Sequence, residues 1–275
     1  MTPTSARQRC EPAPPNPELA LLVEQNHAEA FLAERVIPGV EAHHDRDVVW
    51  IVHSGQAWRN AGIQVRFSRS SAPRRLDALL ARYRRHCRGM ALWISPAATP
   101  DTLPALLHDR ELRCRKHFPA MVRTLRHRVR LPTPPDGLEI RAVRTLDEYE
   151  RLPYPSIGPL TTTLRRVAFE RLHRLLADRK GRTRAFVAWL DGQPVGAIEL
   201  FHGTESAGVH GLSVLDRYQG RGIASALLEE GCREAGNEGF DHVVLLATTE
   251  GQRLYQRRGF VEVGRFGYWY RSFQR

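Results

Sequence analysis

A six-residue turn, Gln219-Gly220-Arg221-Gly222-Ile223-Ala224, constrains the fold of this chain more than any other segment. The apolar pattern before it predicts a strand over 209–215, and the pattern after it predicts a helix over 223–238. A glycine-rich turn that opens a helix leaves backbone N–H groups unpaired at the positive end of the helix dipole. The sequence therefore predicts an α/β protein with a phosphate-binding place between a strand and a helix.

Three general explanations of this turn are open. A dinucleotide-binding fingerprint needs G-x-G-x-x-G directly after the first strand, but Ser225 stands in place of the third glycine and four residues separate strand and turn. A P-loop needs a Gly-Lys-Ser/Thr ending, which the turn lacks. The third explanation is a connection closed by glycines that binds no ligand, because short glycine motifs often occur by chance.

The neighbourhood of the turn narrows this choice. The stretch 214–228 resembles the acyl-CoA-binding segment of the GCN5-related N-acetyltransferases, the GNAT family. The family pattern, Gln/Arg-x-x-Gly-x-Gly/Ala, falls on Gln219, Gly222 and Ala224. A second segment of that family, Leu254 to Phe260, follows about thirty residues later. The resemblance covers about 138–270, which is one whole acetyltransferase domain.

The resemblance implies a GNAT fold, an α/β fold with a mixed sheet, and acetyl-CoA as cosubstrate. The pyrophosphate of coenzyme A would lie on the N–H groups of the turn. The pantetheine arm would pair with the backbone of Val214, in a gap between that strand and the one that carries Leu246 and Ala247. The residues expected to bind acetyl-CoA are Leu212, Val214, Gln219, Gly220, Arg221, Gly222, Ile223, Ala224 and Ser225.

The chain departs from the family pattern at two places. Asp216 stands where many members carry Pro, and Thr248 and Thr249 stand near where an Asn often contacts the pantetheine. Neither change removes a backbone contact, so acetyl-CoA binding is expected to survive.

Catalytic candidates follow from the attack of an amine on a thioester. By the resemblance, Tyr255 occupies the position from which a Tyr donates a proton to the leaving thiolate; the alternative is a core aromatic. The amine must be neutral, so a base is useful. The candidates are His210, which strand alternation would place on one face with Leu212 and Val214, and Glu199 on the preceding strand. Either could be structural instead, and a chain of water molecules would then serve.

A proline-rich segment over 131–137 divides the chain. Three prolines and a glycine there break both helix and strand, so we expect a linker. It separates a first domain over 18–130 from a catalytic domain over 138–275, and residues 1–17 are expected to be a disordered tail. In the catalytic domain, Asp191-Gly192 predicts a hairpin.

Both halves of the chain predict a similar order of strands and helices. In the first half, helices are expected over 20–36 and 73–88, and a strand over 62–68. In the second half, the strand over 260–269 is expected to close the sheet. The first half lacks a glycine turn, and its turn over 95–101 carries two prolines, which have no N–H donors. We therefore expect two GNAT-like domains in tandem, the first degenerate and without a CoA site.

Positive charge is concentrated in the first half. Up to residue 130 there are 21 Lys and Arg against 12 Asp and Glu, which is +9 of the chain's net +11. The densest run, Arg82 to Arg88, could meet RNA or a polyphosphate. The other interpretation is the solvated face of a helix, because an apolar stripe lies beside the run. The stripe consists of Leu76, Leu79, Leu80 and Tyr83.

Several other classes of protein are not indicated. No apolar run approaches the length of a membrane span, and no signal-peptide pattern is present. The four cysteines lack paired spacing, which is typical of reduced thiols in a cytoplasmic protein. His43-His44-Asp45 has no second cluster to complete a metal site, so no metal is expected.

Together these features predict an acyl-CoA-dependent N-acetyltransferase. It would transfer the acetyl group of acetyl-CoA directly to a primary amine within a ternary complex. The acceptor is expected to be a small-molecule or peptide amine, whose identity the sequence does not reveal, and the chain a monomer or homodimer. The alternative is a CoA-binding regulatory or RNA-associated module without transferase activity.

Overall fold

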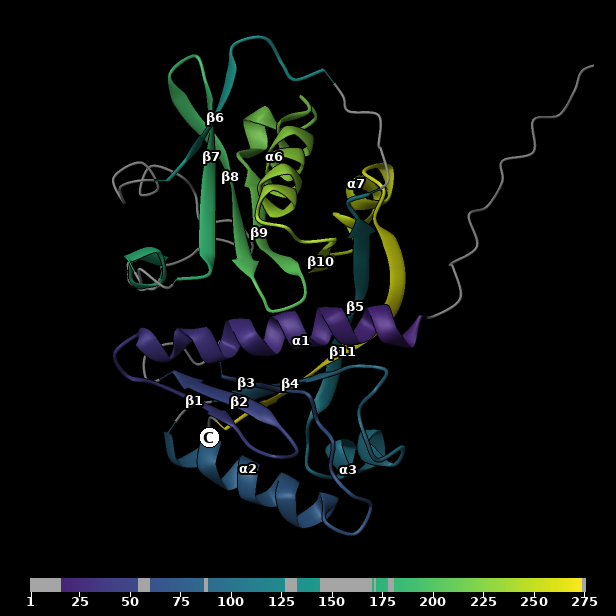
Figure 1. Ribbon diagram of the computed structural model, residues 1–275. Coiled ribbons are helices and arrows are strands. Elements are labelled where there is room, and N and C mark those ends of the chain that lie inside the picture. The colour runs from purple at the N-terminus through teal and green to yellow at the C-terminus, as the bar shows by residue number, and fades with distance from the viewer. Residues whose placement is uncertain are drawn as a thin grey trace, which may run out of the picture.

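One mixed sheet of eleven strands forms the frame of the protein (Figure 1). The computed structural model describes residues 16–53, 60–86, 89–126, 133–143, 170, 172–177 and 181–273. The strand order is β1-β2-β3-β4-β11-β5-β10-β9-β8-β7-β6. The predicted mixed α/β class is confirmed.

The strands are β1 (Val40–His44), β2 (Val49–His53), β3 (Ala61–Ile63), β4 (Gly89–Ile94), β5 (Arg113–Thr124), β6 (Leu138–Ala142), β7 (Thr183–Leu190), β8 (Gln193–His202), β9 (Ala207–Val214), β10 (His242–Leu246) and β11 (Val261–Ser272). The helices are α1 (Pro17–Ala33), α2 (Ala72–His86), α3 (Leu103–Asp109), α6 (Ile223–Asn237) and α7 (Gln252–Arg257), with 3-10 turns η1 (Glu34–Val36) and η3 (Asp216–Tyr218). Residues 172–177 are also helical.

Helix α1 runs across the sheet and contacts strands of both halves, from β1 to β3 on one side and from β8 to β11 on the other (Figure 1). Asn16 caps its first turn by accepting a hydrogen bond from the Leu19 amide at 3.1 Å. Pro17 suits the first helical position because no N–H is needed there. These two residues start the helix earlier than predicted, inside the expected tail; residues 1–15 lie outside the described part of the chain.

The two halves exchange strands in the middle of the sheet. The last strand of the first half, β5, pairs antiparallel with β10 of the second half. The last strand of the chain, β11, then lies between β5 and β4. The prediction that the strand over 260–269 closes the sheet is therefore wrong, because this strand is paired on both sides inside the sheet.

The second half has helices on both faces of its strands. Helix α6 covers the cluster that contains Ile198, Leu200, Leu227 and Phe260. The other face packs on residues 172–177, where Leu172 is fully buried. Between β7 and β8, Leu190 pairs directly with Gln193 across Asp191-Gly192, whose φ values are 50° and 72°. The predicted hairpin is thus confirmed, with a two-residue turn.

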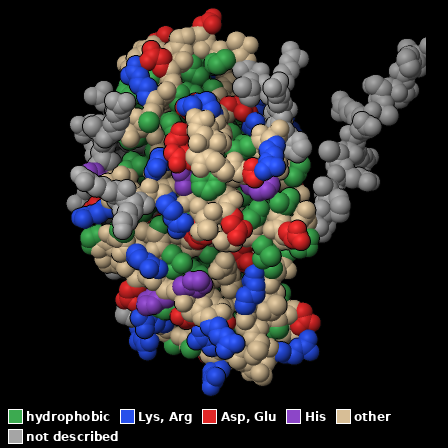
Figure 2. Space-filling view, viewed as in Figure 1, with side chains coloured by type: hydrophobic (Ala, Val, Ile, Leu, Met, Phe, Trp, Pro, Cys, Tyr) green, Lys and Arg blue, Asp and Glu red, His purple; other side chains and the backbone are tan. Residues whose placement is uncertain are grey.

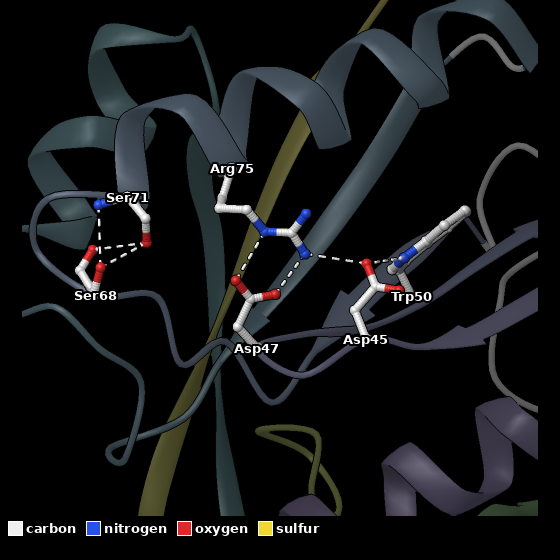
Figure 3. Close-up of polar contacts among 6 residues, drawn as sticks. All are labelled: Asp45, Asp47, Trp50, Ser68, Ser71 and Arg75. Atoms are coloured by element: carbon white, nitrogen blue, oxygen red, sulfur yellow. Dashed lines mark hydrogen bonds and ion pairs between the residues drawn. The ribbon is translucent and has the colours of Figure 1, made fainter.

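In the first half, α2 is the amphipathic helix that the sequence predicts. Its predicted apolar stripe is buried in a separate core. Ion pairs stabilise its polar side. Arg75 Nε donates to Asp47 at 2.8 Å (Figure 3), and Arg82 donates to Glu41 at 2.9 Å. Arg74, Arg84 and Arg85 stay exposed. Figure 2 shows Lys and Arg side chains gathered at the lower end of this face, where α2 lies in Figure 1.

The strand predicted over 62–68 is shorter in the structure. Strand β3 ends at Ile63, and Gln64 follows with φ of 56°. A left-handed residue interrupts a strand, because the pleat requires extended backbone on both sides. Val65 and Phe67 are nevertheless buried in the core under α2.

Membrane-spanning helices and metal-ligand clusters can both be searched for among the described residues. Among them, no helix is long and apolar enough to cross a membrane. Within the same residues, His43 stacks on Trp50 with ring centroids 4.0 Å apart, and no cluster of three potential metal ligands is found.

Candidate active site

A gap opens in the second half where β9 and β10 separate. The two parallel strands pair only from Ala207–Val243 to Val209–Leu245. Beyond that point β9 continues to Val214 without pairing with β10. The chain after β10 stays on β5, where the Ala247 amide donates to the carbonyl of Pro119. The splayed strands expected from the resemblance are thus present.

The glycine turn lies at the open end of this gap. Gly220 and Gly222 have φ values of 76° and 84°, in the left-handed region where glycine costs least. Gly222 is the N-cap of α6, and no side chain caps this helix. The first N–H groups of a helix have no partners within it, so those of Ile223, Ala224 and Ser225 point out of the exposed turn.

Side chains around the turn add positive charge and hold its shape. The guanidinium groups of Arg217 and Arg221 lie 5.0 and 5.3 Å from the ring centroid of Tyr218. Gln219 Nε2 donates to the carbonyl of Val214 at 3.2 Å and to Asp216 Oδ1 at 3.0 Å. A carbonyl has two lone pairs, so Val214 can still accept from a second donor.

Tyr255 lies on the same side of the sheet as the glycine turn. It packs on the cluster under α6, as Leu212 and Val214 do. Its ring meets Phe260 edge-on, with centroids 5.7 Å apart. Burial raises the pKa of the Tyr255 hydroxyl to about 12. The phenol is therefore protonated at neutral pH and can serve as a proton donor.

His210 does not share a face with Leu212 and Val214, so that part of the prediction is wrong. The register of β9 against β8 shifts between the pairs Val209–Leu200 and Gly211–Glu199, which makes His210 the extra residue of a β-bulge. The bulge resets the alternation, and the imidazole of His210 turns to the opposite face of the sheet, towards α1.

On that face His210 meets residues that the sequence did not suggest. Its Nε2 lies 2.9 Å from Oδ1 of Asn26, and its ring lies 4.6 Å from that of His27. The ring of Phe201 contacts it edge-on at 6.0 Å. Asn26 and His27 belong to α1, far away in sequence, and no local pattern could have linked them to this strand.

Glu199 lies on the same face as His210. Its neighbours Ile198 and Leu200 point into the cluster under α6, so the carboxylate of Glu199 points the other way. It is 4% exposed and faces Gly211 across the ladder. The two base candidates therefore lie on one side of the sheet, and Tyr255 lies on the other.

Residues 144–260 match the model of the acetyltransferase (GNAT) family. This part of the chain is therefore similar to a GNAT domain. It contains the splayed strands, the glycine turn and all three catalytic candidates. No protein with a curated description is similar enough to count as a relative.

Solved structures share the fold over nearly the whole chain at low sequence identity. A GCN5-related N-acetyltransferase from Kribbella flavida has a TM-score of 0.62 and 14% identity, covering 89% of this chain and 94% of that one. One from Sphaerobacter thermophilus has a TM-score of 0.59 and 17% identity, covering 95% of both chains. A tandem GNAT protein from the clavulanic acid biosynthesis pathway has a TM-score of 0.59 and 15% identity, covering 94% and 95%. The arrangement of strands and helices outside residues 144–260 thus also occurs in these solved structures.

The first half contains a counterpart of the GNAT gap, between the parallel strands β3 and β4. There the gap is filled, because the Thr99 amide donates to Val65 at 3.0 Å and the Phe67 amide donates to Thr99 at 3.2 Å. Thr99 therefore occupies the backbone positions that an added strand would use.

The turn that corresponds to the glycine turn also differs. By topology it precedes α2, at Ser68 to Ser71. The predicted order of strands and helices had instead suggested residues 95–101. The Ser71 amide donates to Oγ of Ser68 at 3.1 Å, which caps the turn (Figure 3). The amide just before α2 is thus bound by a side chain of its own turn, whereas no side chain caps α6.

Proposed function

We propose that this protein is an acetyl-CoA-dependent N-acetyltransferase that transfers the acetyl group directly to a primary amine. The observation that carries this proposal is the exposed, uncapped glycine turn of α6 beside the gap between β9 and β10. The turn can bind a pyrophosphate, and the gap can accept an extended chain.

The turn and the gap suit the two parts of coenzyme A. The pyrophosphate lies on the N–H groups of residues 221–225, with Arg217 and Arg221 adding charge-assisted contacts. The pantetheine arm lies in the gap, with Leu212 and Val214 along one side. Backbone N–H groups at the point of separation then polarise the thioester carbonyl.

The placement of the candidates on two faces fits direct transfer. The amine approaches from the face of His210 and Glu199, one of which takes its proton, and its nitrogen attacks the thioester carbon. The carbon–sulfur bond then breaks, and Tyr255 on the opposite face protonates the thiolate. The base then releases the amine's proton to solvent, and Tyr255 takes up a proton from solvent, so protons and charges balance over one turnover.

The acceptor is a small-molecule or peptide amine. The face that carries the base candidates is bounded by α1, so the first half takes part in shaping the acceptor side. Binding of RNA by α2 is the lesser alternative, because Arg75 and Arg82 are engaged in ion pairs within the protein.

The test is the release of free thiol from acetyl-CoA in the presence of a panel of primary amines. Tyr255→Phe is expected to lower kcat by roughly a hundredfold, the usual scale of a lost proton donor, with nearly unchanged affinity for acetyl-CoA. Tyr270→Phe, on β11 in the first-half part of the sheet, is the matched control and is expected to keep full turnover. Coenzyme A binding without thiol release for any amine would favour a regulatory module instead.

A further inference from the structure

A cavity of about 520 Å³ lies at the outer edge of the second half. It is lined by the end of β6, the segment 172–177, the first residues of β7 and the C-terminal half of α6. Figure 1 shows the segment 172–177 beside the lower end of β7. The volume lies within the range of roughly 300 to 1,000 Å³ that is usual for pockets that bind small molecules.

This cavity is separate from the candidate active site. Strands β8 and β9 lie between β7, which lines the cavity, and the gap beside β10. Along α6, the helical rise from Gly222 in the glycine turn to Glu230 at the cavity is roughly 12 Å, at 1.5 Å per residue. A ligand in the cavity would therefore not occupy the place expected for acetyl-CoA.

Charged side chains from two elements line the cavity. On α6, Arg233 and Glu230 neutralise each other, since Arg233 Nε and Nη2 donate to the two Glu230 oxygens at 2.9 and 2.5 Å. Arg184 of β7 and Glu234 of α6 also line the cavity, as does the exposed His173. Within the described part of the chain, neither Arg184 nor Glu234 forms an ion pair. The cavity thus holds one guanidinium and one carboxylate that no described residue neutralises.

Arg184 is held in place by the backbone. Its Nη1 donates to the carbonyl of Gly181 at 2.9 Å and to that of Thr183 at 3.1 Å. Both bonds use the same nitrogen, which leaves the donors on Nε and Nη2 for a ligand. A guanidinium binds a carboxylate best through two parallel N–H groups, so Arg184 is suited to a carboxylate.

Glu234 lies at the negative end of a helix dipole. It belongs to the last turn of α6, and that turn contains no basic residue. A carboxylate is unfavourable in this position because it adds to the negative potential of the helix end. An ammonium group beside Glu234 would offset that potential, so this side of the cavity is suited to a cation.

We propose that the cavity binds an α-amino acid with an apolar side chain, whose carboxylate pairs with Arg184 and whose ammonium group pairs with Glu234. The side chain of the ligand lies against the apolar part of the wall, which includes Val143, Leu176 and Phe186. This inference goes beyond acetyl transfer and does not depend on it.

The test is isothermal titration calorimetry of the full chain without acetyl-CoA. The probes are L-leucine, L-phenylalanine, 3-phenylpropionate, which lacks the ammonium group, and 2-phenylethylamine, which lacks the carboxylate. L-Phenylalanine is expected to bind more tightly than either analogue by roughly tenfold or more, because each analogue leaves one charge of the cavity unpaired. Equal affinity of L-phenylalanine and one analogue, or no binding of either amino acid at millimolar concentrations, would overturn the inference.

Variants locate the binding, since the amino acids are amines and could also enter the gap as acceptors. Glu234→Gln and Arg184→Gln are each expected to weaken the binding of L-phenylalanine by roughly tenfold or more. Glu234→Gln keeps the size of the side chain and suffices if Arg184→Gln does not fold. The matched control is Glu238→Gln, which removes an exposed carboxylate one turn further on, outside the cavity.

Unchanged affinity in Glu234→Gln would show that the amino acid binds elsewhere and would contradict the inference. The titrations contain no acetyl donor, so their outcome is independent of whether any amine is acetylated. A failure of the proposed function is therefore distinguishable from a failure of this inference.

Discussion

Arg123 on β5 binds Glu229 on α6 through one guanidinium nitrogen, Nη1, which lies 2.9 Å from each carboxylate oxygen. The two side chains are 8% and 13% exposed. In sequence, β5 belongs to the first half and α6 to the second. The pair therefore joins the exchanged strand to the helix that carries the glycine turn, deep in a shared interface.

Breaking this pair is expected to destabilise the whole protein. Arg123→Met leaves a buried carboxylate without its cation, and should lower the free energy of unfolding by about 3 kcal/mol. Arg123→Met combined with Glu229→Leu should recover most of that loss, because no charge then remains buried. Urea unfolding of the three proteins measures both effects.

The matched control is Arg126→Ala, which breaks an ion pair with Asp241. That pair is exposed, with 76% and 51% of the side chains accessible, and its loss should cost less than about 1 kcal/mol. Equal losses for Arg123→Met and Arg126→Ala would show that the Arg123 pair contributes nothing beyond a surface contact.

The strand exchange marks the limit of prediction from this sequence. The turn between β9 and α6 is local: glycines, an apolar strand and an amphipathic helix follow each other within about thirty residues, so the pattern predicted all three. The place of β11 depends on which partner strand it meets, and β4 and β5 lie more than a hundred residues away. Apolar alternation gives a strand its faces but not its neighbours.

The catalytic candidates show the same limit at smaller scale. Alternation placed His210 beside Leu212, and one inserted residue reversed that relation. Nothing in the sequence marks a bulge here except the small residues Gly208 and Gly211. Asn26 was unpredictable for another reason, since a buried amide on an apolar helix has no signature before its partners are known.

Gly222→Ala is expected to weaken acetyl-CoA binding by roughly tenfold or more. Its φ of 84° is strained for any residue with a Cβ atom, so the turn shifts and its N–H groups lose their common direction. Gly192→Ala is the control: Gly192 has φ of 72°, and a Cβ atom would meet nothing within 4 Å. Both changes should cost about 1 kcal/mol of stability, but only Gly222→Ala should alter the dissociation constant in isothermal titration calorimetry. Equal affinities for both variants would argue against a phosphate at the turn.

Calorimetry should also give a stoichiometry near one acetyl-CoA per chain. In the first half, Thr99 occupies the backbone of Val65 and Phe67, and Ser68 caps the turn before α2. A ligand there would have to displace both. Gly222→Asp, which places a carboxylate at the phosphate position of the second half, should therefore abolish binding completely. If the unaltered protein bound two acetyl-CoA molecules per chain and Gly222→Asp still bound one, a second CoA site would lie in the first half.

Mild acid should destabilise the protein through His27. Burial lowers the pKa of His27 from 6.5 to about 4, so between these values the unfolded chain binds a proton that the folded chain does not. Stability is thus fully present above pH 6.5 and falls as the pH drops towards 4, by about 2 to 3 kcal/mol. The pKa of His202 is also lowered by burial, and it adds to the fall in the same direction.

His27→Gln should flatten this acid dependence, because glutamine can still donate to the Val23 carbonyl but does not titrate. Urea unfolding at several pH values between neutrality and the folded pKa of His27 measures the slope. His44→Gln, at an exposed histidine on β1, is the control and should keep the slope of the unaltered protein. If His27→Gln keeps that slope as well, the proton taken up on unfolding belongs to another group, and His202→Gln becomes the variant to measure.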